Sequence, residues 1–61
     1  MIKVTSAGTG VPIFLNSFWI ESVYENFKSR KTEVYVHGDE DPYTVQEDVD
    51  EVIHRIEDDR R

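Results

Sequence analysis

The chain has 61 residues, no cysteine and a net charge of −6, and 38% of its residues are hydrophobic. A chain of this length forms one domain, residues 1–61, whose core supplies only about 3–5 kcal/mol, so we expect a homodimer to supplement it. This composition excludes disulfides, thiolate metal sites and thiol nucleophiles, and no segment approaches the about 20 apolar residues of a membrane span, so we expect a cytoplasmic protein.

The charge is unevenly distributed along the chain. Residues 1–38 carry three glutamates against four lysines and arginines, a balance of +1. Residues 39–61 carry ten carboxylates against three arginines, a balance of −7. Because such an acidic half repels phosphates and attracts basic protein surfaces, we expect a protein partner and no nucleic acid.

The first elements expected are two short strands. Apolar residues alternate with polar ones over residues 2–5. After a glycine-containing reversal at residues 7–10, Val11, Ile13 and Leu15 alternate with Pro12, Phe14 and Asn16. Pro12 falls near the start of the second run, where a missing N–H does least harm. The pattern predicts a β-hairpin.

Residues 18–26 are ambiguous, because their apolar positions do not keep a period of two. A helical turn competes with a third strand over about residues 20–26. We favour the strand, since β-branched and aromatic residues dominate, and expect a bulge within it.

The clearest strand pattern covers residues 32–37, with Val34 and Val36 predicted to face inward. Residues 38–42 have the composition of a turn, and residues 43–46 predict a short final strand.

The apolar spacing then changes to that of a helix, expected over about residues 48–58. Asp48 can cap its first turn, and Glu51 completes a capping box and can pair with Arg55. The apolar residues stop early, so residues 57–61 are expected to fray. The stripe expected to seal the sheet comprises Val49, Val52, Ile53 and Ile56. The sequence therefore predicts an α+β fold, with a small antiparallel β-sheet of four to five short strands within residues 1–46 packed by one C-terminal α-helix.

Candidate chemistry is sparse. Glu51 and His54 have the Glu-x-x-His spacing of di-iron bundles, but they lie opposite the apolar stripe, which indicates a solvated face. The acidic run at residues 39–41 lacks the glycine and distant glutamate of an EF-hand. His37 and His54 are the only imidazoles. We therefore expect no catalytic, cofactor-binding or metal-binding residues, no cofactor and no enzymatic activity.

Aromatic residues are the main candidates for binding. The chain has seven of them, more than so small a core can bury. Since Tyr and Trp are enriched at binding hot spots, those expected to be exposed are candidate protein-contact residues. They are Phe18, Trp19, Tyr24, Tyr35 and Tyr43.

Two alternatives stay open. An acidic face on the helix could mimic a DNA backbone and let a phage- or host-encoded regulator bind or inhibit a nucleic-acid-binding protein. The basic turn at residues 27–31, which holds one aromatic residue and three cations, could bind RNA weakly. The candidate acidic face comprises Asp50, Glu51, Glu57 and Asp58.

Several stretches, taken in chain order, carry a family resemblance: 1–5, 14–16, 19–23, Gly38, 43–45 and 49–56. Their order resembles the small flagellar and swarming-motility proteins of the FlbD/SwrD type, some of which are phage-encoded. The resemblance implies a non-enzymatic module that acts in motility by binding a protein partner. The layout of strands followed by one helix is also similar to the carbon storage regulator family, which supports a dimer by analogy only.

Overall fold

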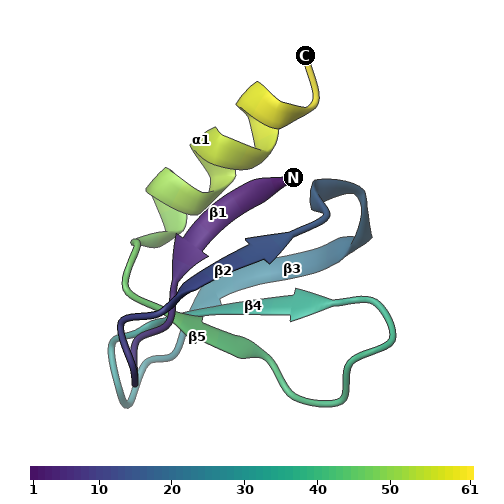
Figure 1. The fold of residues 1–61 in the computed structure, drawn as a ribbon. Coiled ribbons are helices and arrows are strands. Elements are labelled where there is room, and N and C mark those ends of the chain that lie inside the picture. Colours follow the sequence, from purple (N-terminus) through teal and green to yellow (C-terminus); the bar gives the residue numbers. More distant parts are fainter.

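The computed structural model describes all 61 residues and has the predicted α+β fold, with five short strands, one 3-10 helix and one α-helix (Figure 1). No helix in it combines the length and apolarity that crossing a membrane requires. In chain order the elements are β1 (Ile2–Thr5), β2 (Pro12–Leu15), the 3-10 helix η1 (Ser17–Trp19), β3 (Ile20–Glu25), β4 (Thr32–Val36), β5 (Tyr43–Val45) and α1 (Val49–Asp59).

The strands form two antiparallel sheets, the hairpin β1–β2 and the three-stranded sheet β3–β4–β5. An isolated bridge between Ser6 and Val45 joins them, and the Ala7 N–H donates to the Thr44 carbonyl beside it (2.9 Å). The strands therefore follow the spatial order β2–β1–β5–β4–β3. Each of β2 and β3 pairs on one side only and is an edge.

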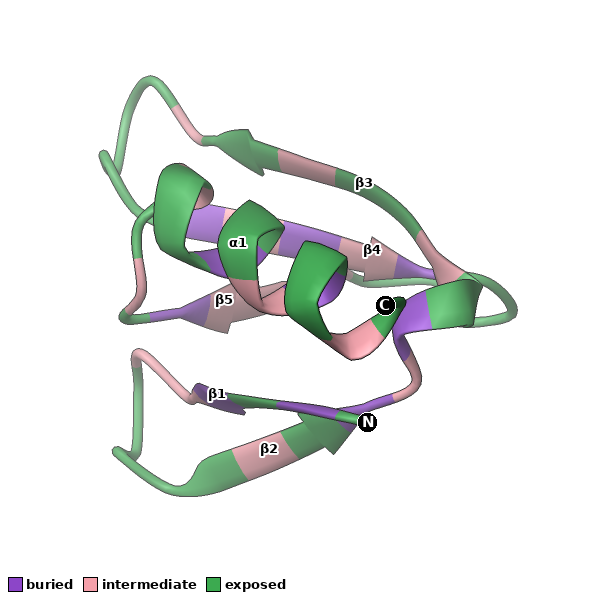
Figure 2. Ribbon diagram, turned by 90° about the horizontal axis from the view of Figure 1, so that it is seen from above, coloured by how far each residue is buried: buried purple, intermediate pink, exposed green.

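The core lies between the strands and α1, which crosses over them (Figures 1 and 2). The predicted inward positions of Val34 and Val36 are confirmed, because alternate residues of β4 are buried. The eight buried core residues are Ile2, Val4, Leu15, Val34, Val36, Val45, Val52 and Ile56.

The apolar stripe of α1 is narrower than predicted. Val52 and Ile56 are buried and Val49 is half-buried, but Ile53 is 39% exposed, so its predicted place in the seal is wrong. Each helical residue turns about 100° from the last, so Val52 and Ile56 share one row while Ile53 points past it.

The start of α1 follows the prediction in part. The Asp48 carboxylate accepts the Glu51 N–H (2.8 Å) and caps the helix. The Glu51 carboxylate turns toward the Arg55 Nε (3.0 Å), forming the predicted i, i+4 pair rather than the reciprocal half of a capping box.

Both interpretations of residues 18–26 describe part of the segment. η1 is a helical turn, and β3 follows it directly, with a bulge between Ile20 and Ser22 as predicted. The expected fraying of residues 57–61 is wrong for the first part of that range, because α1 continues to Asp59.

Candidate protein-contact surface

Large exposed apolar side chains concentrate in one part of the chain. Six of the eight lie within residues 11–27, which run from β2 through η1 to β3, so both edge strands and their connection carry them (Figure 2). Contiguous exposed apolar patches mark interaction surfaces, whereas single exposed apolar side chains are common, so the surroundings of each side chain decide its role. The six are Val11, Phe14, Phe18, Trp19, Tyr24 and Phe27.

The η1 turn presents Phe18 and Trp19, whose exposed fractions are 70% and 59%. Asn16 caps this turn, because its Oδ1 accepts the Phe18 N–H and its carbonyl accepts the Trp19 N–H, both at 3.0 Å. The Trp19 carbonyl accepts the His37 N–H (2.7 Å). The backbone that carries the two exposed rings is therefore fixed from both sides.

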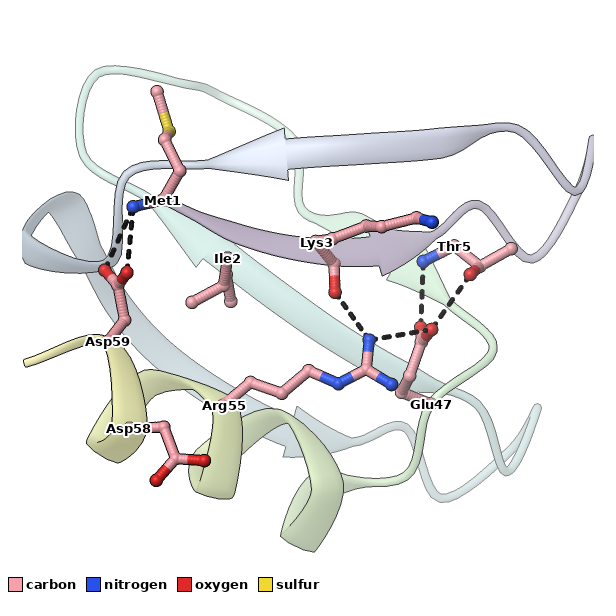
Figure 3. A pocket seen from close by; sticks show the side chains of 8 residues that line it. All are labelled: Met1, Ile2, Lys3, Thr5, Glu47, Arg55, Asp58 and Asp59. Atoms are coloured by element: carbon pink, nitrogen blue, oxygen red, sulfur yellow. Dashed lines mark hydrogen bonds and ion pairs between the residues drawn. The ribbon is translucent and has the colours of Figure 1, made fainter.

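A group of polar contacts, which we call the Ser17 clamp, ties η1 to the end of α1. Ser17 is fully buried, its hydroxyl donates to the Asp59 Oδ2 (2.6 Å), and its carbonyl accepts the Arg60 Nη2 (2.7 Å). The α-amino group of Met1 donates to both Asp59 oxygens at 3.0 and 3.1 Å (Figure 3). The Ser17 hydroxyl and this amino group hold the pKa of Asp59 below its ordinary value. These contacts explain why α1 continues beyond its last buried apolar residue.

Two exposed rings are covered by cations of the chain itself. The Arg60 guanidinium lies over the Phe18 ring at 5.2 Å from its centroid, and the Lys28 ammonium lies over Phe27 at 5.9 Å. Trp19 has neither a cation over its ring nor an aromatic neighbour stacked on it. Among the predicted contact residues, Trp19 is therefore an exposed ring with no cation or stacked aromatic side chain over it.

Tyr24 and Tyr35 form a pair across β3 and β4. Their rings stack with centroids 5.9 Å apart, Tyr24 is 39% exposed and Tyr35 is half-buried. The neighbouring Glu33 carboxylate, followed by Tyr35, raises the pKa of the Tyr24 hydroxyl. The pair lies on β3–β4 rather than on η1, so these rings form a second, separate surface.

Tyr43 is half-buried rather than exposed. The residue lies opposite Val34 in the β4–β5 register, and its ring packs against the core. Its hydroxyl donates to the Asp39 Oδ2 (3.2 Å), and this carboxylate raises the pKa of Tyr43.

Phe14 is an exposed aromatic that the sequence prediction missed, with 63% of its surface accessible. It lies opposite Lys3 in the β1–β2 register and on the other side of β2 from the buried Leu15. The alternation in residues 11–16 could have indicated this exposure, because it places Phe14 on the face of the strand opposite to the inward residues.

The predicted acidic face is exposed, but part of it is already paired. Glu51 bonds Arg55, and the Asp58 carboxylate lies 3.4 Å from the His54 Nε2. Asp50 and Glu57 have no ion-pair partner in the structure. Only half of the face is free for a ligand.

A groove lies between β1 and α1 (Figure 3). The Arg55 Nη1 donates to the Lys3 carbonyl (2.5 Å) and lies 3.3 Å from the Glu47 Oε2, and Glu47 accepts the N–H and hydroxyl of Thr5, both at 2.9 Å. Burial would raise the pKa of Glu47, but the bonds from Thr5 and the charge of Arg55 outweigh it and lower the pKa. The lining residues are Met1, Ile2, Lys3, Thr5, Glu47, Arg55, Asp58 and Asp59.

In this groove Glu47 pairs with Arg55, and the Met1 amino group pairs with Asp59, and these contacts join the helix to the first strand and the residues beside it. No group of three or more His, Asp or Glu side chains in the structure could hold a metal ion. No buried polar side-chain atom lacks a hydrogen-bond partner.

The fold and the surface together define a small α+β domain that presents an ordered aromatic turn. Comparison of the chain with protein-family models, curated proteins and solved structures finds no match.

Proposed function

We propose that the protein is a non-enzymatic interaction module that binds a protein partner through η1, with Trp19 at the centre of the contact. The observation that carries this proposal is a tryptophan 59% exposed on a turn whose backbone is fixed by Asn16, His37 and the Ser17 clamp. Tryptophan is the residue type most enriched at binding hot spots. A turn that is already ordered loses little entropy on binding, which raises affinity.

The same surface supports the finer proposal of a motility role. The resemblance to the FlbD/SwrD type runs through residues 19–23, which begin at the exposed Trp19. We therefore propose that the partner is a protein of the flagellar or swarming apparatus and that the contact forms in the cytoplasm.

Site-specific photo-crosslinking tests the proposal. A benzophenone amino acid placed at position 18, beside Trp19 on η1, in a motile bacterium that expresses the chain should give one dominant crosslinked protein. The matched control is position 27, because Phe27 is also exposed, at 79%, but lies beyond the other end of β3. Equal products at both positions, or none at position 18, would contradict the proposal.

An acidic regulator that binds a nucleic-acid-binding protein is the second candidate. It is favoured by the free carboxylates of Asp50 and Glu57 on α1, which face solvent without ion-pair partners. Crosslinking from position 57 to a polymerase or nucleoid protein would support it. Salt-dependent retention of labelled RNA would instead favour the weak RNA-binding alternative at residues 27–31.

A further inference from the structure

The chemistry of the partner can be specified further, on the basis of the proposed function. We propose that η1 binds a basic segment of the partner, with one Lys or Arg side chain over the Trp19 ring and a neighbouring cation beside the acidic loop at residues 39–41.

The first step concerns the aromatic rings. Phe18 and Phe27 each have a cation of this chain over the ring, at 5.2 and 5.9 Å. Trp19 has none, although the indole is the best cation acceptor of the aromatic side chains. Trp19, the ring best suited to a cation, is therefore left open by the fold, as the exposed Phe14 also is.

The second step concerns the charge beside that ring. The connection from β4 to β5 starts at His37, whose N–H bonds the Trp19 carbonyl (2.7 Å), and both views place this connection at the η1 end of the molecule (Figures 1 and 2). Asp39 is bonded to the Tyr43 hydroxyl, but Glu40 and Asp41 are exposed and have no hydrogen-bond or ion-pair partner. Unpaired carboxylates at the same end of the molecule as an open indole complement a cationic ligand.

The third step concerns the basic side chains already at this end. Arg60 is held by the Ser17 carbonyl and the Phe18 ring, and the His37 Nδ1 lies 2.9 Å from the Glu21 Oε2. Neither reaches Glu40 or Asp41 in the structure. The carboxylates therefore keep their charge available to a partner.

The same charge argues against a lipid surface. Exposed Phe and Trp side chains also occur on proteins that bind membrane interfaces. Cellular membranes present anionic headgroups, which attract basic and repel acidic protein segments. A basic protein segment therefore fits this end of the molecule better than a membrane does.

Trp19 is the only tryptophan of the chain, so its fluorescence reports directly on binding. A library of random 12-residue peptides displayed on phage is selected against the full chain, and the enriched peptides are then titrated while the fluorescence is followed. We expect enriched peptides to carry Lys or Arg. Each positive charge of the peptide should add an electrostatic attraction that salt screens. The affinity should therefore fall about fivefold between 20 and 200 mM NaCl.

Matched variants locate the contact. Glu40→Gln with Asp41→Asn should weaken the peptides about five- to tenfold, since two exposed charge pairs are lost. The control, Asp50→Asn with Glu57→Gln, removes the same charge from α1 and should leave affinity unchanged. Trp19→Ala should abolish binding. Because this variant has no tryptophan, its binding is followed with a fluorescent dye attached to the peptide.

The outcomes separate the inference from the proposed function. Uncharged peptides that need Trp19 but tolerate Glu40→Gln with Asp41→Asn would overturn the inference and leave the proposed function standing. A blue shift of Trp19 fluorescence on anionic phosphatidylglycerol vesicles would overturn the inference in favour of a membrane. No enriched peptide, or peptides that bind Trp19→Ala equally well, would overturn both.

Discussion

Arg30 is the one residue other than glycine with a positive backbone φ, at 62°. It closes the turn between β3 and β4, in which the Asn26 side chain accepts the N–H groups of Lys28 (2.9 Å) and Ser29 (3.1 Å). A residue with a Cβ atom is strained in this left-handed conformation, whereas glycine is not. The turn therefore holds strain that the sequence pattern did not indicate.

Replacing Arg30 with glycine should stabilise the protein by about 1 kcal/mol, because relief of this strain exceeds the gain in unfolded-chain entropy. Urea denaturation measures the change. Arg30→Ala is the control, since it also removes the exposed pair with Glu25 (3.4 Å) but keeps the Cβ atom. If alanine stabilised the protein as much as glycine does, loss of charge rather than backbone strain would be the cause.

Glu47 makes stability depend on pH. Its pKa is lowered from the ordinary 4.5, so its contribution is present above pH 4.5 and is lost as the pH falls toward the folded-state value. Glu47→Gln should cost about 1 kcal/mol at pH 7, because the bonds from Thr5 and Arg55 lose their charged acceptor. The difference from wild type should shrink below pH 4.5.

Urea denaturation of both proteins between pH 3 and pH 7 measures this difference. The control is Glu57→Gln, which removes an exposed carboxylate with no hydrogen-bond partner. A Glu47→Gln penalty that stays constant over the whole range would contradict the assignment.

At the scale of elements, local patterns predicted the strands and the helix, because each depends on neighbours in sequence. The period of two gave β1, β2, β4 and β5 within two residues, and the ambiguity at residues 18–26 reflected a real change from η1 to β3. The periodicity does not predict how much of the helix surface the sheets bury. α1 packs against β1 of one sheet and β3 of the other, and only Val52 and Ile56 of its apolar residues are buried there.

This difference predicts unequal losses for two isoleucines of α1. Ile56→Ala should cost about 2–4 kcal/mol, a large share of the stability of so small a domain, because it empties a buried site. Ile53→Ala, at a residue 39% exposed, should cost less than about 1 kcal/mol. Circular dichroism during urea denaturation compares them, with sucrose added if Ile56→Ala is partly unfolded. If both variants lost equal free energy of unfolding, Ile53 would belong to the buried apolar stripe, as the sequence predicts.

The contact surface was less predictable than the elements. Phe18 and Trp19 could be proposed from aromatic surplus alone, but the Ser17 clamp joins residues 42 positions apart through polar atoms. Neither periodicity nor capping rules indicate such a pairing. Tyr43 was expected to be exposed but is half-buried, because its surroundings depend on which strand lies beside β5.

At the scale of the whole molecule, open edges and a small core make association the central question. β2 has four residues and begins with Pro12, and β3 carries a bulge and two glutamates. Short strands, proline, bulges and charges are features that hinder edge-to-edge pairing. The predicted homodimer would therefore form through side chains rather than by extending a sheet.

The net charge of each copy determines how self-association depends on salt concentration. Each copy carries −6, and the molecule measures 33 × 22 × 21 Å. The screening length is about 30 Å at 0.01 M salt and about 8 Å at 0.15 M, so the whole charge of each copy opposes association only at low salt. Self-association should therefore strengthen as salt rises.

Binding of a basic partner segment should respond to salt in the opposite direction, because salt screens an attraction there.

Sedimentation equilibrium of the chain alone in 10 and 300 mM NaCl should give a larger dimer fraction at the higher salt concentration. The Glu40→Gln, Asp41→Asn variant, with two charges fewer per copy, should need less salt to reach the same fraction. A dimer that is stable at 10 mM NaCl and dissociates at 300 mM would mean that complementary charges, rather than apolar side chains, hold the two copies together.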